Sequence, residues 1–381
     1  MYCRLSNGLQ HIDEFSHVAY CVGPFQLAFL LSSLQVSGIL AASCMILPFA
    51  AISGVSNDDL LKNLRLVCEH LGIKTCDASL LPSPTLKEVY SFYSDTKRSH
   101  HSVFWYCKGG LWPLSALSHL RKALPDIVFE YYDGFRSPIV AQEEGKKILS
   151  LSNIHCFGDF CQSAVQRLMH PDWHFMPDDG LWVKYTPREV QSRTDYIPLS
   201  VAQDKIRLVG QILDEVHGGQ DTMDAPGTVL LTGMFSEWRE FASLADELKM
   251  YDDILGVVRS VSRTTPILVK SHPRTFPEKM RGLGDICAKY NAELYSRQQL
   301  VEYMFEKSGR HDVAVIGPPS TALLSTIQFG YGRAFCPSQQ LMISYVGHEY
   351  ANDPWMTRDH ELMEIVGVNM FDSLQELRDL L

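Results

Sequence analysis

Several motifs that identify common nucleotide-dependent enzymes are missing from this sequence. No GxGxxG follows its first apolar run and no GxxxxGK[ST] occurs anywhere, so dinucleotide oxidoreduction and P-loop phosphoryl transfer lose their usual markers. A DxD pair, which would hold a metal ion together with a nucleoside diphosphate, is missing too. If the chain uses a nucleotide, it binds that nucleotide through another arrangement of residues.

A surplus of positive charge and closely paired cysteines are also missing. The 34 Lys and Arg residues are outnumbered by 44 Asp and Glu residues, and the net charge of −10 argues against a nucleic-acid partner. The ten cysteines are scattered without a CxxC pair, as in a reduced, cytoplasmic protein. No secretory signal is evident at the start, so we expect a cytoplasmic location.

The longest uncharged segment runs from Val18 to Asn57, which is long enough for a membrane span of about 20 residues. Gly23 and Pro24 interrupt it, however, and Gln26 falls in its apolar helical part. These interruptions favour a strand, a helix and a second strand buried in a domain over a single membrane helix.

Short apolar runs alternate with longer helical patterns along the 381 residues, 46% of which are hydrophobic. Strands are expected at 17–22, 43–50, 102–107, 126–132, 228–233, 265–270, 312–317 and 332–337. Helices are expected at 57–72, 113–124, 200–216, 237–251, 277–291, 298–309, 320–330 and 373–381. This alternation predicts an α/β fold with parallel sheets covered by helices.

A stretch rich in Gly, Pro and polar residues at 217–228 predicts a linker between two such regions. We therefore expect domains at 1–200 and 201–381, arranged as two facing Rossmann-like domains with the active site in the cleft between them. The amphipathic segment at 373–381 is a candidate for a last helix that crosses back to brace the first domain.

In open α/β sheets, ligands bind at the carboxyl ends of the strands, so the residues that come after each predicted strand are the candidates. Asp133 and Gly134 follow the strand at 126–132, and His272 follows the strand at 265–270. A carboxylate that accepts a proton and an imidazole that donates one form a general base and general acid pair.

A third candidate group follows the strand at 312–317. The segment GPPSTALL passes from Gly317 into a helix that starts with Ser320 and Thr321. Amide groups and hydroxyls at the start of a helix bind anions such as phosphate. Taken singly, an Asp-Gly turn, a His-Pro pair and a Ser-Thr helix cap are each common structural features.

Together, EYYDG, KSHPR and GPPSTAL resemble the D/E-D/E-G, HP and Ser/Thr motifs of bacterial sialyltransferases with the GT-B fold, most closely the bacterial polysialyltransferase family. The opening strand followed by GPFQ is similar to the start of these enzymes, and the resemblance spans most of the chain through short motifs. Tyr132 departs from the pattern, because the family usually has an acidic residue there.

The resemblance implies an inverting, metal-independent transfer of sialic acid from CMP-sialic acid to a glycan hydroxyl, with an N-terminal acceptor domain and a C-terminal CMP domain. Asp133 is the expected base, and His272 is expected to protonate or hydrogen-bond the departing phosphate. We expect the bound phosphate to favour the protonated imidazole. The expected donor-binding residues are Gly233, Ser236, Lys270, Pro273, Arg274, Gly317, Ser320 and Thr321, and those lining the cleft or acceptor site are Gly23, Pro24, Gln26 and Gly134.

Competing motifs lie in the segment HPDWHFMPDDG at 170–180. Its Asp178-Asp179-Gly180 matches the acidic motif fully, but no strand is predicted before it, so we favour a loop. His155, Cys156, Cys161, His170, Asp172 and His174 offer metal-ligand atoms. Only His170 and His174 have the close spacing of a zinc pair, so we expect no metal and no other cofactor.

Other interpretations stay open at this point. A transferase that uses CMP-Kdo or CDP-glycerol would carry similar HP and Ser/Thr motifs, and a non-catalytic glycan- or nucleotide-binding protein would keep the fold. For the enzyme, the acceptor is a glycan or oligosialic acid, as in capsule or surface glycan synthesis. Peripheral association with the inner membrane or with a capsule-synthesis complex is a further open interpretation.

Overall fold

The computed structural model describes residues 17–21, 23–48, 58–75, 103–107, 127–131, 173–178, 191–192, 194–217, 226–237, 241–295 and 299–381. The chain divides into two compact units, Met1–Leu213 and Asp214–Leu381. The division falls near the end of helix α10 (Leu199–Val216), whereas the sequence placed the domain boundary at the start of that helix.

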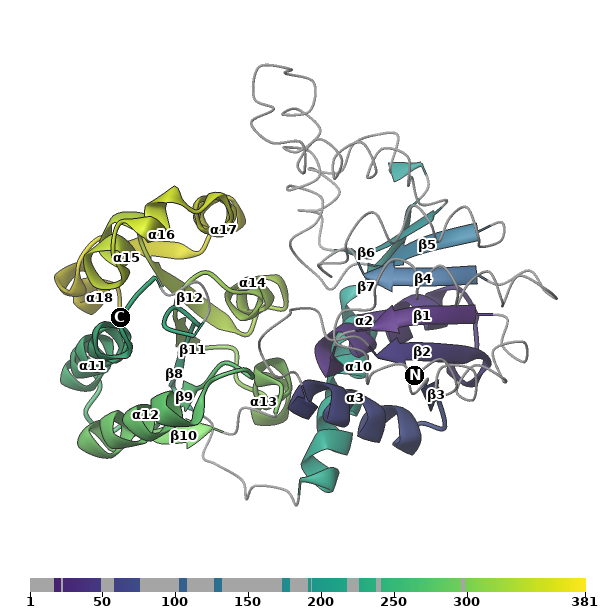
Figure 1. The fold of residues 1–381 in the computed structure, drawn as a ribbon, viewed down its shortest axis with the longest axis horizontal. Coiled ribbons are helices and arrows are strands. Elements are labelled where there is room, and N and C mark those ends of the chain that lie inside the picture. Colours follow the sequence, from purple (N-terminus) through teal and green to yellow (C-terminus); the bar gives the residue numbers. More distant parts are fainter. Residues whose placement is uncertain are drawn as a thin grey trace, which may run out of the picture. The chain divides into compact units, whose positions relative to one another are not determined.

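The first unit is built on a seven-stranded sheet with the order β3-β2-β1-β4-β5-β6-β7, and all neighbouring strands are parallel (Figure 1). Its strands are β1 (His17–Cys21), β2 (Cys44–Pro48), β3 (Lys74–Thr75), β4 (Val103–Cys107), β5 (Ile127–Tyr131), β6 (Trp173–Asp178) and β7 (Thr194–Pro198). The four strands expected from the sequence are confirmed, and β3, β6 and β7 were not predicted.

Strand β6 corrects the interpretation of the Asp178-Asp179-Gly180 motif. The sequence WHFMPD has no regular alternation and contains Pro177, so it has weak strand propensity. Pairing with β5 on one side and β7 on the other nevertheless makes it a parallel strand. Asp178 ends this strand, so the expectation of a loop without a preceding strand was wrong.

The uncharged segment folds as the expected strand, helix and strand. Helix α2 (Pro24–Val36) is apolar on all sides, and the side chains from Leu27 to Leu34 are buried. The hydroxyls of Ser32 and Ser33 donate to the carbonyls of Ala28 and Phe29, both at 2.8 Å, so these buried polar groups are satisfied within the helix. Helix α3 (Asp58–His70) packs against α2.

The second unit has a six-stranded parallel sheet with the order β10-β9-β8-β11-β12-β13. Its strands are β8 (Thr228–Leu231), β9 (Ile267–Lys270), β10 (Glu293–Tyr295), β11 (Val313–Ile316), β12 (Gly332–Pro337) and β13 (Asn369–Phe371). Its helices are α11 (Leu244–Val261), α12 (Pro277–Tyr290), α13 (Val301–Ser308), α14 (Thr321–Gln328), α15 (Gln339–Val346), α16 (Glu349–Asn352), α17 (Pro354–Val366) and α18 (Leu374–Leu380).

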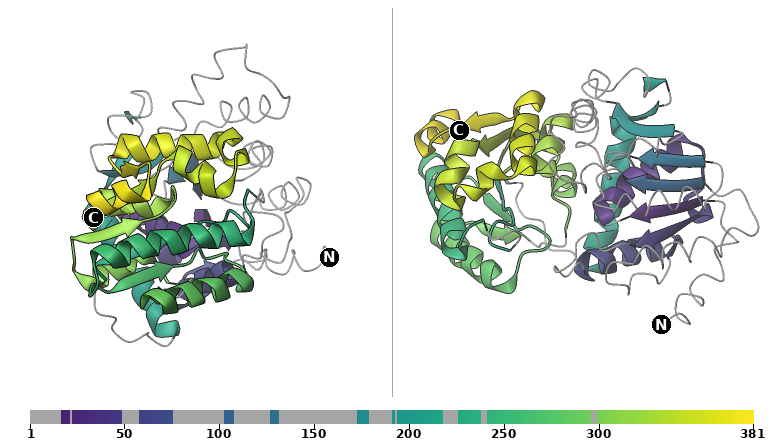
Figure 2. Two further views of the ribbon diagram at one scale, coloured as in Figure 1. Left: turned by 90° about the vertical axis from the view of Figure 1, so that its left-hand side faces the viewer. Right: turned by 45° about the horizontal axis from the view of Figure 1, so that its top comes forward.

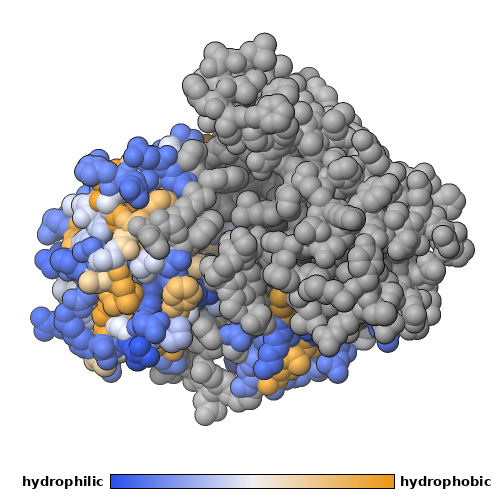
Figure 3. All heavy atoms as spheres, viewed as in Figure 1, coloured by the Kyte–Doolittle hydropathy of each residue, from blue (hydrophilic) through white to orange (hydrophobic). Residues whose placement is uncertain are grey.

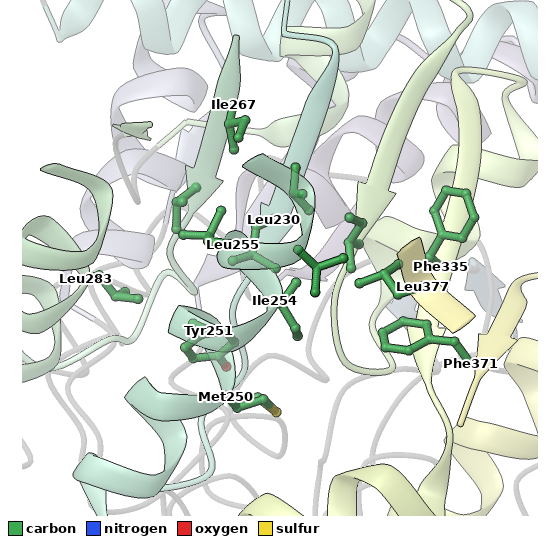
Figure 4. Close-up of a cluster of buried hydrophobic side chains, with 14 of the residues drawn as sticks. Leu230, Met250, Tyr251, Ile254, Leu255, Ile267, Leu283, Phe335, Phe371 and Leu377 are labelled. Carbon is green, nitrogen blue, oxygen red and sulfur yellow. The ribbon is translucent and has the colours of Figure 1, made fainter. Parts of the chain in front are cut away.

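Both sheets follow one connection pattern. In chain order within each unit, the first strand lies beside the second on one side and the fourth on the other, which is the Rossmann arrangement. Figures 1 and 2 show α11 and α12 on one face of the second sheet and α13 and α14 on the other. The core between the sheet and α11 contains Leu230, Tyr251, Ile254 and Phe335 (Figure 4).

The starts and packing of two helices bear on the sequence expectation. Helix α11 begins at Leu244 and not at 237, because Ser243 caps it by accepting a hydrogen bond from the Asp246 amide at 3.1 Å. Helix α18, the candidate for crossing back to the first domain, packs against α11 and β13 within the second unit, with Leu377 fully buried.

No helix among the described residues is both long enough and apolar enough to cross a membrane. On the face shown in Figure 3, apolar side chains of the second unit lie among hydrophilic ones. This mixture is usual for the exposed part of a folded domain.

Candidate functional site

The carboxyl ends of β8, β9 and β11 bring three of the predicted segments to one edge of the second sheet. Strand β8 lies between β9 and β11, and the pairs Leu231 with Lys270 and Ile316 with Leu230 align their ends. The helices that follow β8 and β11 lie on opposite faces of the sheet (Figure 1). This reversal between two adjacent strands is where α/β sheets bind their ligands.

Gly317 allows β11 to approach β8 closely at this edge. A Cβ atom on Gly317 would lie 2.7 Å from the Cβ of Leu231 and 3.0 Å from its carbonyl oxygen. The Gly317 amide also donates to the carbonyl of Phe335 on β12 at 3.0 Å. Glycine is therefore required here by packing between strand ends. This packing and the hydrogen bond to Phe335 fix the position of the chain just before Ser320.

His272 is held by backbone hydrogen bonds on both sides. Its amide donates to the hydroxyl of Thr232, which comes directly after β8, at 3.1 Å. The amide of Arg274 donates to the imidazole Nδ1 at 3.2 Å, across the Pro273 turn. Because Nδ1 accepts this bond, the neutral ring carries its proton on Nε2, which is then a hydrogen-bond donor.

Burial lowers the pKa of His272 to about 3, and the positive charges of Arg274, Lys270 and Lys279 act in the same direction. The sequence indicated the two neighbouring cations but not the burial or Lys279. In the folded chain the imidazole is therefore neutral at pH 7, and a bound phosphate would have to overcome all of these effects to protonate it.

Two buried charged residues, Lys270 and Glu302, lie beside this edge. The Lys270 ammonium donates to the Ser271 carbonyl at 3.2 Å and lies 5.9 Å from the centre of the Tyr295 ring. Glu302 accepts a hydrogen bond from Ser325 at 3.1 Å. Burial raises the pKa of Glu302, and its hydrogen bonds, including that from Ser325, and the charge of Lys270 partly oppose that shift. The sequence analysis missed Glu302.

Ser320 caps α14, as its position after β11 predicted. Its hydroxyl accepts a hydrogen bond from the Leu323 amide at 3.4 Å, and Thr321 is the exposed first residue of the helix. The Thr321 carbonyl accepts from Ser325 at 3.0 Å, which connects the start of α14 to Glu302 through one side chain. The first turn of α14 therefore presents amides and a hydroxyl, the groups that bind phosphate.

Gly233 and Ser236, two of the predicted donor-binding residues, are hydrogen-bonded within the protein in the loop after β8. The amide of Gly233 donates to the Tyr251 hydroxyl at 2.7 Å, and the amide and hydroxyl of Ser236 both donate to Glu247, at 2.9 and 2.6 Å. The Phe235 amide also donates to Glu247, at 3.4 Å. A carboxylate of the protein itself thus occupies the amides that such a loop would otherwise offer to a phosphate.

Glu247 and its partner Lys279 were missed, although the sequence contains a signal for both. Glu247 lies one turn before Met250 and Tyr251 on the buried side of α11, and Lys279 lies one turn before Leu283 on the buried side of α12. A charged residue in an apolar helical stripe indicates a buried ion pair. The partner of each could not be found from helical periodicity alone.

The predicted residues of the first unit are placed only in part. Asp133, Gly134 and Tyr132 lie outside the described residues, beyond β5, which ends at Tyr131. Gly23 and Pro24 stand at the start of α2, where Pro24 needs no hydrogen-bond acceptor for its nitrogen. Gln26 lies in the first turn of the same helix and is partly buried.

The metal-ligand candidates also lie mostly outside the described residues. His155, Cys156, Cys161, His170 and Asp172 are not described, whereas His174 lies within β6. Across the part of the chain that the structure describes, no group of three His, Cys, Asp or Glu side chains is arranged to hold a metal ion.

No protein-family model matches the chain, and no curated protein matches its sequence. Solved structures do match. The GT-B domain of a sialyltransferase from Photobacterium damselae superposes with a TM-score of 0.50 at 10% identity, covering 94% of this chain and 98% of that chain. The chain has the GT-B fold. A UDP-GlcNAc 2-epimerase from Methanocaldococcus jannaschii gives 0.53 at 9% identity, covering 95% and 91%.

This GT-B similarity supports a glycosyltransferase-like architecture and confirms the expected α/β fold class. It does not choose an activity, because one matching structure is a transferase and the other an epimerase. The choice depends on the residues at the strand ends.

Proposed function

We propose that the chain is an inverting glycosyltransferase that moves sialic acid from CMP-sialic acid to a hydroxyl of a glycan acceptor. The observation that carries this proposal is the pairing, at one sheet edge, of a neutral His272 with a Ser320-capped helix, while Glu247 occupies the amides of the neighbouring loop. One anion-binding helix start and one imidazole donor suit a nucleoside monophosphate leaving group.

In the proposed reaction, the acceptor oxygen attacks the anomeric carbon while the bond from that carbon to the phosphate oxygen breaks. The electron pair of the broken bond leaves with CMP, and the acceptor proton passes to the carboxylate of Asp133. His272 donates its Nε2 proton as a hydrogen bond to the phosphate, and Ser320 and Thr321 bind the same phosphate. Lys270 and Arg274 add positive charge beside it. No step needs a metal ion.

Strand β6 adds a second candidate for the base. Asp179 follows Asp178 directly, and Asp178 ends a parallel strand adjacent to β5, after which Asp133 comes. We retain Asp133 because it belongs to the motif EYYDG, and we treat Asp179 as the specific alternative that mutagenesis has to eliminate.

The function is tested by incubating the purified chain with labelled acceptors and, separately, CMP-sialic acid, CMP-Kdo, CDP-glycerol and UDP-GlcNAc. We expect free CMP and an acceptor mass increased by sialic acid. A product ladder would identify polysialylation, and a single addition would exclude it. Turnover with only another donor would reassign the donor. Binding of CMP without turnover on any acceptor would favour a non-catalytic binding protein.

A further inference from the structure

A buried ion pair connects α11 and α12 directly behind the loop after β8. The side chains of Glu247 and Lys279 are 0% and 1% exposed, and they are hydrogen-bonded to each other. Lys279 also donates to the carbonyl of Gly233 at 2.8 Å and to Glu237 at 2.9 Å, so all three ammonium protons have acceptors.

The carboxylate of Glu247 is equally well satisfied. Besides Lys279, it accepts from the amide and hydroxyl of Ser236, from the Phe235 amide and from the Tyr251 hydroxyl at 3.0 Å. Tyr251 in turn accepts from the Gly233 amide. Each of these contacts leads to the backbone or to a side chain of residues 233–237, so the pair determines the conformation of that loop.

The same network reaches the loop that carries His272. The Glu237 carboxylate accepts from the Phe276 amide at 3.3 Å, and Thr232, next to Gly233, accepts from the His272 amide. Lys279 is also one of the cations that lower the pKa of His272. A change in the ion pair would therefore alter the position of the imidazole and the charges that surround it.

A gain in the free energy of unfolding does not by itself explain why a buried ion pair stands at this position. Removing two charges from water is costly, and apolar side chains of similar size often replace a buried ion pair without loss of stability. A fully hydrogen-bonded polar network does, however, favour one conformation over its alternatives. The effect of this pair is thus expected in the geometry of the two loops more than in the free energy of unfolding.

We propose that Glu247 and Lys279 are positioning residues of the nucleotide site, which hold residues 233–237 and the His272 loop in the arrangement that binds the CMP part of the donor. This inference rests on the proposed function. Because both side chains are fully buried, they act through the loops and not by contact with the nucleotide.

The principal variant is Glu247→Gln, which keeps the shape of the side chain and leaves Lys279 paired with Glu237. The amide nitrogen of Gln cannot accept from Ser236, so the loop loses bonds without a cavity forming. The matched control is Asp252→Asn, on the same helix, which removes an exposed ion pair to Lys289 at 2.7 Å on α12. Tyr251→Phe is a milder second variant that frees the Gly233 amide.

CMP affinity is measured by calorimetry well below the melting temperature of each variant, alongside kcat and KM for transfer. We expect the CMP Kd of Glu247→Gln to rise about tenfold or more, as for loss of hydrogen bonds to a charged group, and that of Tyr251→Phe to rise less. Asp252→Asn should stay within about twofold of the wild type.

A lower melting temperature with an unchanged CMP Kd in both network variants would show a merely structural pair and overturn the inference. If Glu247→Gln does not fold, Tyr251→Phe decides alone. If the wild type itself does not bind CMP, both the proposed donor and this inference are wrong. If the wild type and both network variants bind CMP equally well, only this inference is wrong.

Discussion

The two units share one strand order but differ in the segment after their first strand. In the first unit, α2 begins at Pro24, close behind β1, so a helix start lies at the sheet edge. In the second unit, β8 ends at Leu231 but α11 begins only at Leu244, and the amides of Phe235 and Ser236 between them donate to Glu247. The helix start at the reversal point of the second sheet is that of α14.

This difference teaches that topology alone does not locate an anion site. Both sheets have the reversal between their first and fourth strands. In the second unit, however, the Glu247 carboxylate accepts hydrogen bonds from the loop after the first strand, where an anion would otherwise bind. In the proposed reaction, Ser320 and Thr321 bind the phosphate, and a carboxylate of the first unit activates the acceptor. Mutagenesis can separate these two assignments, and the base is expected to give the largest effect.

Asp133→Asn should reduce transfer by about 10²- to 10⁴-fold, the usual loss when a general base is removed. Its CMP Kd should remain that of the wild type, because the carboxylate serves the acceptor. Transfer rates and calorimetry check the two halves of this expectation. Asp179→Asn is the matched comparison, and an active Asp133→Asn together with an inactive Asp179→Asn would move the base to the segment after β6.

His272→Ala should lower kcat by about 10²-fold, as for loss of one preorganised donor to a developing negative charge. The pH profile of kcat/KM reports the free enzyme, in which the pKa of His272 is lowered to about 3. We therefore expect no limb near pH ~6.5 that disappears in His272→Ala. Such a limb, present in the wild type and lost in the variant, would show that the imidazole is protonated before the donor binds.

Ser320→Ala should raise the donor KM about tenfold with a smaller change in kcat, because its hydroxyl binds the phosphate in ground and transition states alike. Ser338→Ala is the control within the same unit, since the Ser338 hydroxyl caps α15 in the same way, by accepting from the Leu341 amide. Both variants should lose about 1 kcal/mol of stability from the missing cap. Equal donor KM values in the two would remove Ser320 from the site.

The second unit should also lose stability in acid through its buried histidines. Burial lowers the pKa of His360 to about 4, against 6.5 for an exposed imidazole. Between these values the unfolded chain binds a proton that the folded chain does not, so stability falls as the pH drops from about 6.5 towards 4. His360→Gln should flatten the dependence of the melting temperature on pH in this range, and an unchanged slope would assign it to other groups.

Excess EDTA should have no effect on the rate of transfer, because every role in the proposed reaction is filled by a side chain or a backbone amide. The rate with and without the chelator is the measurement. Complete loss of activity that Mg²⁺ or Mn²⁺ restores would contradict the proposed mechanism and direct attention to the acidic residues of the first unit.

Local pattern in the sequence was sufficient for much of the second unit. Short, mostly apolar runs predicted β8, β9 and β11, and the residues after them were correctly placed at strand ends. Helix α14 starts at Thr321, one residue after the start expected from the sequence, because Ser320 is its cap. These features depend on neighbours within one turn or one strand, which the sequence displays directly.

The tertiary structure alone decided the features that depend on distant partners. Strand β6 exists because β5 and β7 pair with it, despite its weak propensity. Glu247 is paired with Lys279 because two helices pack side by side, and the low pKa of His272 comes mainly from burial. Burial and pairing are set by segments far apart in the chain, so periodicity shows that a charge is buried but not what satisfies it.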